Sequence, residues 1–135
     1  MEIHFTRDSV CMGDDCFDNS RDYTFKDTDL QSEIMPRIKK EHFLASVNKN
    51  NVVWVLCNAD GEEILSYLTL ADKIICHTKK STIKAICGKE KTLHFRYYSS
   101  PQKRAEHILK LNNGNAENIG RSDISEEYKL CNQLG

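Results

Sequence analysis

The apolar run from Val52 to Cys57 (VVWVLC) constrains the fold of this chain more than any other segment. Its valines and tryptophan favour a β-strand, which we place at residues 51–58. Asp60-Gly61 follows as a two-residue hairpin signal, so residues 63–70 are expected to return as the partner strand. Because the run is apolar at successive positions, both faces of the strand must be covered. We therefore expect strand 51–58 to lie in the centre of a sheet.

Trp54, the single tryptophan, is predicted to pack in the core against Ile34 and Ile38 of a helix that begins near Leu30. Pro36 interrupts this helix, because proline in a helix interior removes a hydrogen bond and clashes with the preceding turn. The helix is therefore expected to restart at the proline or to consist of two short pieces. The alternative for Trp54 is an exposed position in a partner-binding surface, where tryptophan is enriched.

Further strands are indicated by alternating apolar residues between clusters of turn formers. They are expected at residues 2–10 and 21–26, as an antiparallel pair, and at residues 73–78, 81–87 and 91–98. Ser99-Ser100-Pro101 is a hydroxyl cap followed by proline, and it predicts a helix that ends at Asn112-Asn113-Gly114. Residues 122–130 are expected to form a last short amphipathic helix.

This order of elements predicts an α+β fold, with a mainly antiparallel sheet and one or two packed helices. Residues 1–111 are expected to form one domain. Residues 112–135 are expected to be a linker followed by a short, loosely attached C-terminal helix. The order β-β-α-β-β over residues 1–78 resembles a β-grasp (ubiquitin-like) fold. This resemblance implies a binding role more than a catalytic one.

Charge is distributed unevenly along the chain, although the formal net charge is −1. Residues 1–72 carry 7 Lys/Arg and 14 Asp/Glu, whereas residues 73–111 carry 10 Lys/Arg and 2 acidic residues. Two interpretations follow. Either the basic third binds an anionic partner, or the basic and acidic parts neutralise each other once the chain has folded.

A candidate binding surface lies in the basic third. Alternation along residues 91–98 places His94, Arg96 and Tyr98 on one face of their strand, and Lys84 of strand 81–87 is expected to join them. Lys103 and Arg104 on the following helix extend this cationic surface, and Tyr98 could stack on a base. The predicted partner-binding residues are therefore Lys84, His94, Arg96, Tyr98, Lys103 and Arg104.

The six cysteines contain no C-x-x-C pair, which argues against a zinc knuckle. Cys57, Cys76 and Cys87 lie in apolar stretches and are expected to be small buried hydrophobes. Cys11 and Cys16 flank a loop whose aspartates are expected to form a solvated turn. A metal or thiol site at these two cysteines is the alternative. The aspartates of this region are Asp14, Asp15, Asp18 and Asp22.

No motif in the sequence specifies a reaction, and neither a catalytic residue set nor a cofactor is predicted. The N-terminus lacks the features of a signal peptide and no run is long enough to cross a bilayer, so a cytoplasmic location without a membrane partner is expected. The leading hypothesis is a small non-enzymatic binding module with a protein partner, which includes an immunity or antitoxin-like role. Nucleic-acid or polyanion binding is the first alternative, and a homodimer built through the C-terminal helix also remains open.

Overall fold

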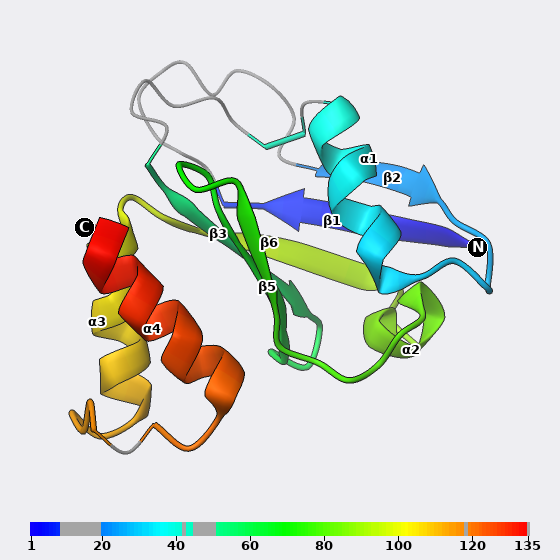
Figure 1. The fold of residues 1–135 in the computed structure, drawn as a ribbon. Helices are drawn as coiled ribbons and strands as arrows, with labels where there is room; N and C mark the ends of the chain where they lie inside the picture. Colours follow the sequence, from blue (N-terminus) through cyan, green and yellow to red (C-terminus); the bar gives the residue numbers. More distant parts are fainter. Residues whose placement is uncertain (9–19, 42, 45–50, 118, 135) are drawn as a thin grey trace.

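The computed structural model describes residues 1–8, 20–41, 43–44, 51–117 and 119–134, which form one six-stranded mixed sheet with helices on both faces (Figure 1). The strand order is β2-β1-β6-β3-β4-β5. The strands are β1 (Glu2–Arg7), β2 (Ser20–Thr24), β3 (Val53–Asn58), β4 (Glu63–Leu68), β5 (Lys73–Cys76) and β6 (Thr92–Tyr98). The helices are η1 (Gln31–Glu33, a 3₁₀ turn), α1 (Ile34–Lys40), α2 (Ile83–Cys87), α3 (Pro101–Leu111) and α4 (Ser122–Leu134). The expected α+β class is confirmed.

Strand β3 is an interior strand, as its apolar run predicted. It pairs antiparallel with β4 on one side and with β6 on the other. Trp54 is 1% exposed and shares a core with Ile34 and Ile38 of α1. Its ring also contacts Tyr97 of β6, with ring centroids 5.0 Å apart. The prediction that Trp54 belongs to the core is confirmed.

Strand β6 is late in the sequence but lies in the middle of the sheet. It pairs in parallel with β1 and antiparallel with β3, and it separates these two strands. Residues 1–78 therefore do not form a continuous sheet by themselves, because β6 joins their two parts. The β-grasp resemblance, which rests on the order of elements over those residues, stays a prediction.

The strand expected at residues 81–87 is wrong, because this segment forms helix α2. The hydroxyl of Thr82 caps it by accepting a hydrogen bond from the backbone N–H of Ala85 at 3.2 Å. The buried residues are Ile83, Ile86 and Cys87, which follow the helical spacing i, i+3, i+4. The apolar residues of this segment fit both the alternation of a strand and the spacing of a helix. The structure adopts the helix, which also buries Ile86.

Pro36 divides the first helical region as expected. The 3₁₀ turn η1 precedes α1, and Pro36 is the third residue of α1. In this first turn an N–H has no partner within the helix, so proline costs no hydrogen bond. The expectation of two short pieces is confirmed.

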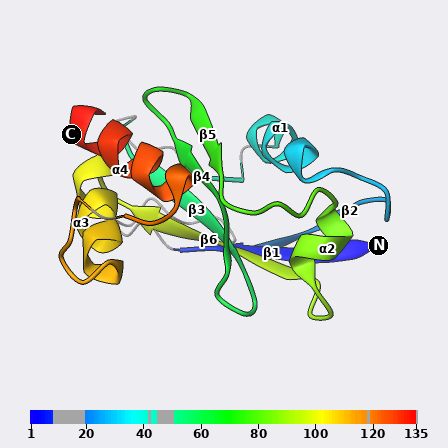
Figure 2. The ribbon, with the colours of Figure 1, turned by 60° about the horizontal axis from the view of Figure 1, so that its bottom comes forward.

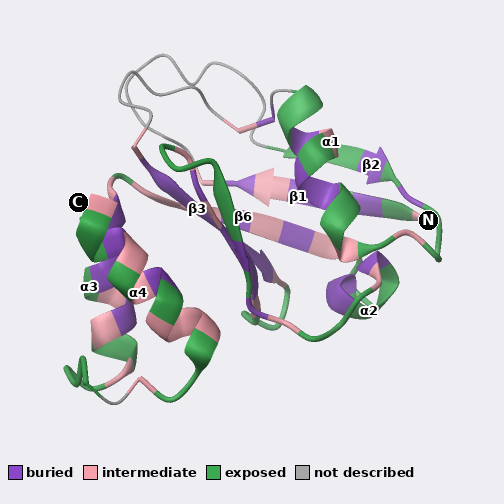
Figure 3. Ribbon diagram, in the orientation of Figure 1, coloured by how far each residue is buried: buried purple, intermediate pink, exposed green. Residues whose placement is uncertain are grey.

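The two faces of the sheet carry separate cores. The main core lies under α1 and α2 and contains Phe5, Trp54 and Phe95 among its members. The second core lies under α3 and α4 at one end of the sheet (Figures 1 and 2). Its members come from β3, β4, β5 and the two helices, and are Val53, Val55, Cys57, Leu68, Ile75, Ala105 and Cys131. Figure 3 shows buried residues on the inner sides of α3 and α4.

The C-terminal segment is packed more firmly than expected. Helix α4 extends to Leu134, and its Glu127 and Cys131 are fully buried. Tyr128 and Leu130 also pack against the second core. Cys131 of this helix is thus buried in the second core, and Tyr128, Leu130 and Leu134 are partly buried against it. Within the described residues, no helix has the length and apolarity needed to cross a membrane.

The cysteines divide into buried and exposed thiols. Cys57 and Cys87 are buried, as predicted, and burial raises the pKa of Cys57 to about 11. Cys76 is exposed, so its prediction as a buried hydrophobe is wrong: it lies at the end of the edge strand β5, and its Sγ accepts a hydrogen bond from Gln31 Nε2 at 2.8 Å. Cys11 and Cys16 lie outside the described residues, as do Asp14, Asp15 and Asp18.

Replacing Trp54 by alanine is expected to lower the free energy of unfolding by about 3–5 kcal/mol, because a cavity opens in the main core. Chemical denaturation followed by far-ultraviolet circular dichroism measures this loss. Leu70→Ala is the control, since Leu70 is 57% exposed, and it should change the stability by less than about 0.5 kcal/mol. Equal stability of the two variants would contradict the core position of Trp54.

A thiol-labelling time course at neutral pH is expected to modify Cys76 before Cys57, Cys87 and Cys131. Exposure allows the reagent to reach Cys76, whereas burial raises the pKa of Cys131 to about 12 and suppresses its thiolate. Peptide mapping by mass spectrometry identifies the labelled sites. Rapid modification of Cys57 or Cys131 in the folded protein would show that the second core is open.

Candidate functional site

The most concentrated polar chemistry is a buried ion-pair network beneath α3 and α4. Arg104 of α3 is fully buried and lies between two carboxylates, those of Glu63 and Glu127. Its Nη1 and Nη2 donate to the two oxygens of Glu63, each at 2.9 Å. Its Nε and Nη2 donate to the two oxygens of Glu127 at 3.0 and 2.9 Å. Both pairs are bidentate, the geometry in which a guanidinium binds a carboxylate most strongly.

Local structure explains why these side chains meet. Ser100 caps α3 by accepting from the backbone N–H of Lys103, and Pro101 begins the helix, which fixes the position of Arg104 one turn later. A register shift in the pairing of β3 with β4 sets Glu63 opposite Cys57. This irregularity lets Glu63 and Ser66 face the same helices although they are three residues apart.

His77 connects this network to the end of β5. Its Nδ1 lies 2.7 Å from Asp123 Oδ2, and its Nε2 lies 3.1 Å from Glu127 Oε1. Ser66 Oγ is also 2.7 Å from Nε2. Burial alone would lower the pKa of His77, but the hydrogen bonds to Glu127 and Asp123 outweigh it and raise the pKa above 6.5. We define the Arg104 network as Arg104, Glu63, Glu127, His77, Asp123 and Ser66.

Ser66, His77 and Asp123 have the distances of a Ser-His-Asp triad, but their burial argues against that role. Ser66 is 0% exposed, so no substrate can reach its hydroxyl. The helix that supplies Asp123 also supplies Glu127, which covers the histidine. Opening the site would therefore remove Asp123 as well. The network is structural.

Breaking the network is expected to destabilise the protein strongly. Arg104→Met leaves two carboxylates without their buried cation and should lower the free energy of unfolding by about 3–5 kcal/mol. Lys103→Met is the matched control, because Lys103 is exposed on the same turn of α3, and it should cost less than about 0.5 kcal/mol. Denaturant unfolding measures both variants. A similar stability of the two would contradict the structural role of Arg104.

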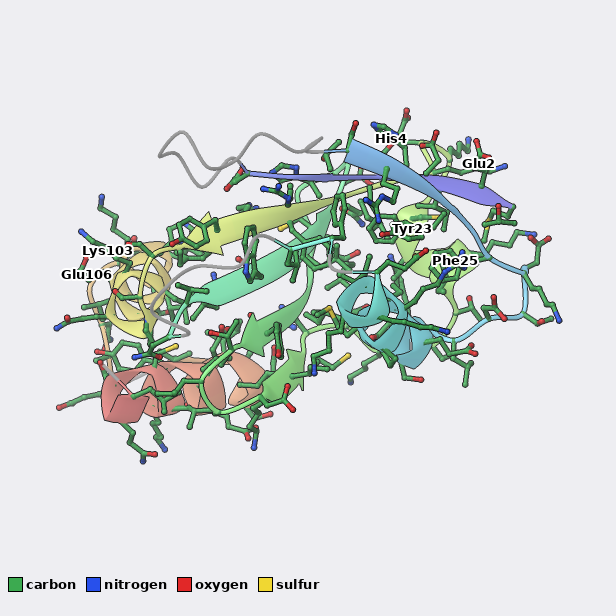
Figure 4. All side chains as sticks on the ribbon, turned by 90° about the horizontal axis from the view of Figure 1, so that it is seen from above. Glu2, His4, Tyr23, Phe25, Lys103 and Glu106 are labelled. Carbon is green, nitrogen blue, oxygen red and sulfur yellow. The ribbon has the colours of Figure 1, made fainter. Side chains whose placement is uncertain are left out.

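The predicted partner-binding residues do not form one surface. His94, Arg96 and Tyr98 share a face of β6, as alternation predicted. Lys84 is on α2, across the sheet from them, and lies 3.6 Å from Asp27. Lys103 is exposed on α3 and points away from the sheet (Figure 4), whereas Arg104 is buried in the network.

Much of the basic third is paired with acidic residues. Arg96 lies 3.6 Å from Glu63, in addition to the pairs of Arg104. Lys73 pairs with Glu126 and Lys80 with Glu62, both at 3.3 Å. These contacts favour the interpretation in which the basic and acidic parts of the chain neutralise each other.

A second candidate site is the face of β2, β1 and β6 that points away from α1. Helices α3 and α4 cover the other end of this face, and among the described residues no helix lies over β2, β1 and the start of β6 (Figure 2). Figure 4 shows Glu2 and His4 directed away from α1, whereas Tyr23 and Phe25 point toward it. We call this surface the open face. The residues at its alternating positions are Glu2, His4, Thr6, Asp8, Ser20, Asp22, Thr24, Thr92 and His94.

Hydrogen bonds fix several side chains of the open face. His4 Nδ1 lies 2.6 Å from Asp22 Oδ1 on the neighbouring strand. His94 Nδ1 lies 2.6 Å from Thr6 Oγ1, and its Nε2 lies 2.8 Å from Asp8 Oδ1. Asp8 Oδ2 also accepts a hydrogen bond from the backbone N–H of Tyr97 at 2.9 Å. The face thus presents two histidine–aspartate pairs in a fixed arrangement.

The open face is acidic. Its carboxylates are those of Glu2, Asp8 and Asp22, and none of its positions named above holds a lysine or an arginine. Arg96 lies farther along β6 and is directed to Glu63. Within the part of the chain that the structure describes, no group of three or more His, Cys, Asp or Glu residues is arranged to hold a metal ion.

Sequence reasoning missed most of the Arg104 network. Its members Glu63, Ser66, His77, Asp123 and Glu127 belong to no motif in the sequence. One signal was present: Asp123 and Glu127 are spaced i, i+4 and therefore lie on one side of α4. Their partners on β4 and β5 could not be read from spacing, because they depend on the order of strands.

Comparison with known proteins adds no relative from which a role could be transferred: no family model, no curated protein and no solved structure matches the chain.

Proposed function

We propose that this chain is a non-enzymatic binding module that recognises a basic surface of a partner protein through the open face. The observation that carries the proposal is an acidic sheet face, not covered by any described helix, whose histidine and aspartate side chains are held by hydrogen bonds. The β-grasp resemblance, which we keep as part of the proposal, also points to binding. An immunity or antitoxin-like role is one form of this function, because neutralising a basic protein requires a complementary acidic surface.

Preorganisation supports this choice of surface. Binding costs conformational entropy whenever a mobile side chain must be ordered at an interface. On the open face, Asp8 is already held by His94 and by the backbone of Tyr97, and Asp22 is held by His4. A partner cation can therefore contact oriented carboxylate oxygens at a reduced entropic cost.

Charge supports a protein partner over a nucleic acid. Phosphates would be repelled by the carboxylates of the open face, and they are bound in proteins chiefly by free lysine and arginine side chains. Of the residues predicted to supply those cations, Arg104 is buried and Arg96 is directed to Glu63. We place the module in the cytoplasm, where its free thiols remain reduced.

The proposal is tested by reversing the charge of the open face. The variant Glu2→Lys with Asp22→Lys replaces two exposed carboxylates, and the control variant Glu106→Lys with Glu117→Lys makes the same charge change on α3 and the loop after it. Purified baits are incubated with native host extract at low and moderate salt, and bound proteins are quantified by mass spectrometry. We expect a stoichiometric basic partner that binds the wild type and the control, and whose affinity for the open-face variant falls tenfold or more, about 1.4 kcal/mol.

Other outcomes identify the alternatives. A partner lost equally from both variants would show that total charge and not the open face matters. Salt-sensitive binding of single-stranded RNA, reduced by Lys84→Glu with Arg96→Glu, would favour the nucleic-acid hypothesis. Turnover of an activated ester that disappears in Thr6→Val would show an enzyme that uses the Thr6, His94 and Asp8 contacts.

A further inference from the structure

Helices α3 and α4 are attached to the sheet by a small apolar core and a large polar network. The second core contributes side chains such as Val55, Leu68 and Cys131, and it is much smaller than the main core on the opposite face. The Arg104 network lies beside it and joins α3, α4, β4 and the end of β5. Attachment of the two helices therefore depends on groups whose charge can change.

His77 is the titratable residue through which the sheet and α4 contact each other. Its backbone N–H donates to Ile64 O at 2.8 Å, which fixes the residue to the sheet. Its side chain is 0% exposed, and its two ring nitrogens contact different carboxylates of α4, those of Asp123 and Glu127. Arg121, just before α4, donates to its carbonyl oxygen. The sheet and α4 thus meet at one imidazole ring.

The charged groups in contact with the ring of His77 are carboxylates. The groups that face it are Asp123 and Glu127 of α4, Arg104 of α3, Glu63 and Ser66 of β4, and Arg121. These comprise three carboxylates, two guanidinium groups and one hydroxyl. Arg121 is 60% exposed, and Arg96, 3.6 Å from Glu63, is 34% exposed, so solvent screens both guanidinium groups more than that of Arg104. A positive His77 therefore offsets part of the negative charge of the buried carboxylates.

The ring has two discrete hydrogen-bonding arrangements. When protonated, it donates from Nδ1 to Asp123, and its Nε2–H lies between Ser66 Oγ at 2.7 Å and Glu127 Oε1 at 3.1 Å. When neutral, it keeps one N–H, so with Nδ1–H on Asp123 the Nε2 lone pair faces Glu127 Oε1 at 3.1 Å. The hydroxyl of Ser66 can then turn to donate to Nε2. Loss of the proton therefore removes the attraction of the charged ring for Glu127 and leaves a lone pair that faces this carboxylate.

We propose that His77 is a pH-sensitive latch: its protonated imidazole holds α3 and α4 on the sheet, and its deprotonation loosens them. Loosening uncovers the second core on β3, β4 and β5 while the main core stays intact. The latch is a property of the isolated chain. It does not depend on the binding role of the open face.

The direction of the pH effect follows from the two shifted groups. The pKa of His77 is raised in the folded protein. The stabilisation that His77 gives to the attached helices is therefore complete below about pH 6.5, and it is lost as the pH rises through the pKa of the folded state. The pKa of Glu127 is lowered to about 2 despite burial, because His77 and Arg104 donate to it. Its contribution is present above 4.5 and is lost as the pH falls toward 2. Attachment of the helices is therefore strongest between 4.5 and 6.5.

Hydrogen exchange with mass spectrometry tests the latch at about pH 6 and about pH 9, corrected for the intrinsic exchange rate. In the wild type we expect the protection of α4 to fall about tenfold or more at the higher pH, while β3 keeps its protection. In His77→Gln, α4 should be weakly protected at both values and show no pH response. His4→Gln removes an exposed histidine outside the Arg104 network and should leave the protection of α4 and its pH response as in the wild type.

Two results would overturn the latch: equal protection of α4 at both pH values in the wild type, or the same pH response in His77→Gln. If His77→Gln fails to fold, nitrogen-15 chemical shifts of the wild-type ring decide. The latch requires both ring nitrogens of His77 to be protonated at about pH 6, since its contribution is fully present only for the imidazolium. A neutral ring at that pH would contradict it.

Discussion

The pairing of β6 between β1 and β3 is the constraint on which the rest of the structure depends. It joins the N-terminal pair of strands to the β3–β4–β5 unit and completes a sheet long enough to support helices on both faces. Leu93 and Phe95 of β6 enter the main core, while His94 and Arg96 emerge on the opposite side. Strand β6 thereby positions both His94 on the open face and Arg96 beside Glu63 of the Arg104 network.

The two faces of the sheet are stabilised by different physics. The main core is a continuous apolar cluster, in which burial of aromatic and branched side chains supplies the driving force. The opposite face combines a few apolar contacts with a buried guanidinium, two glutamates and a histidine. Desolvating these charges is costly, and their mutual hydrogen bonds must offset that cost. Such an arrangement fixes one orientation of α3 and α4, because any other leaves a buried charge without a partner.

The uneven charge along the chain has a tertiary explanation. Acidic Glu62 and Glu63 meet cations from the basic third, and the acidic C-terminal helix supplies Glu126 and Glu127 to Lys73 and Arg104. This mutual compensation leaves the acidic character of the N-terminal strands exposed on the open face. The surface to examine for a partner is therefore the acidic open face, and not the cationic surface that the composition of the basic third suggested.

The sequence by itself determined the features that neighbouring residues encode: the central apolar strand β3, the two-piece helix at Pro36 and the capped start of α3 at Ser100. The sequence pattern predicted a strand where α2 forms, because residues 81–87 fit the periodicity of a strand as well as that of a helix. The tertiary structure alone decided that Arg104 meets Glu63 across 41 positions and Glu127 across 23. Such contacts follow from strand order and from the side on which a helix packs. No local propensity encodes them, since they exist only when the whole sheet has formed.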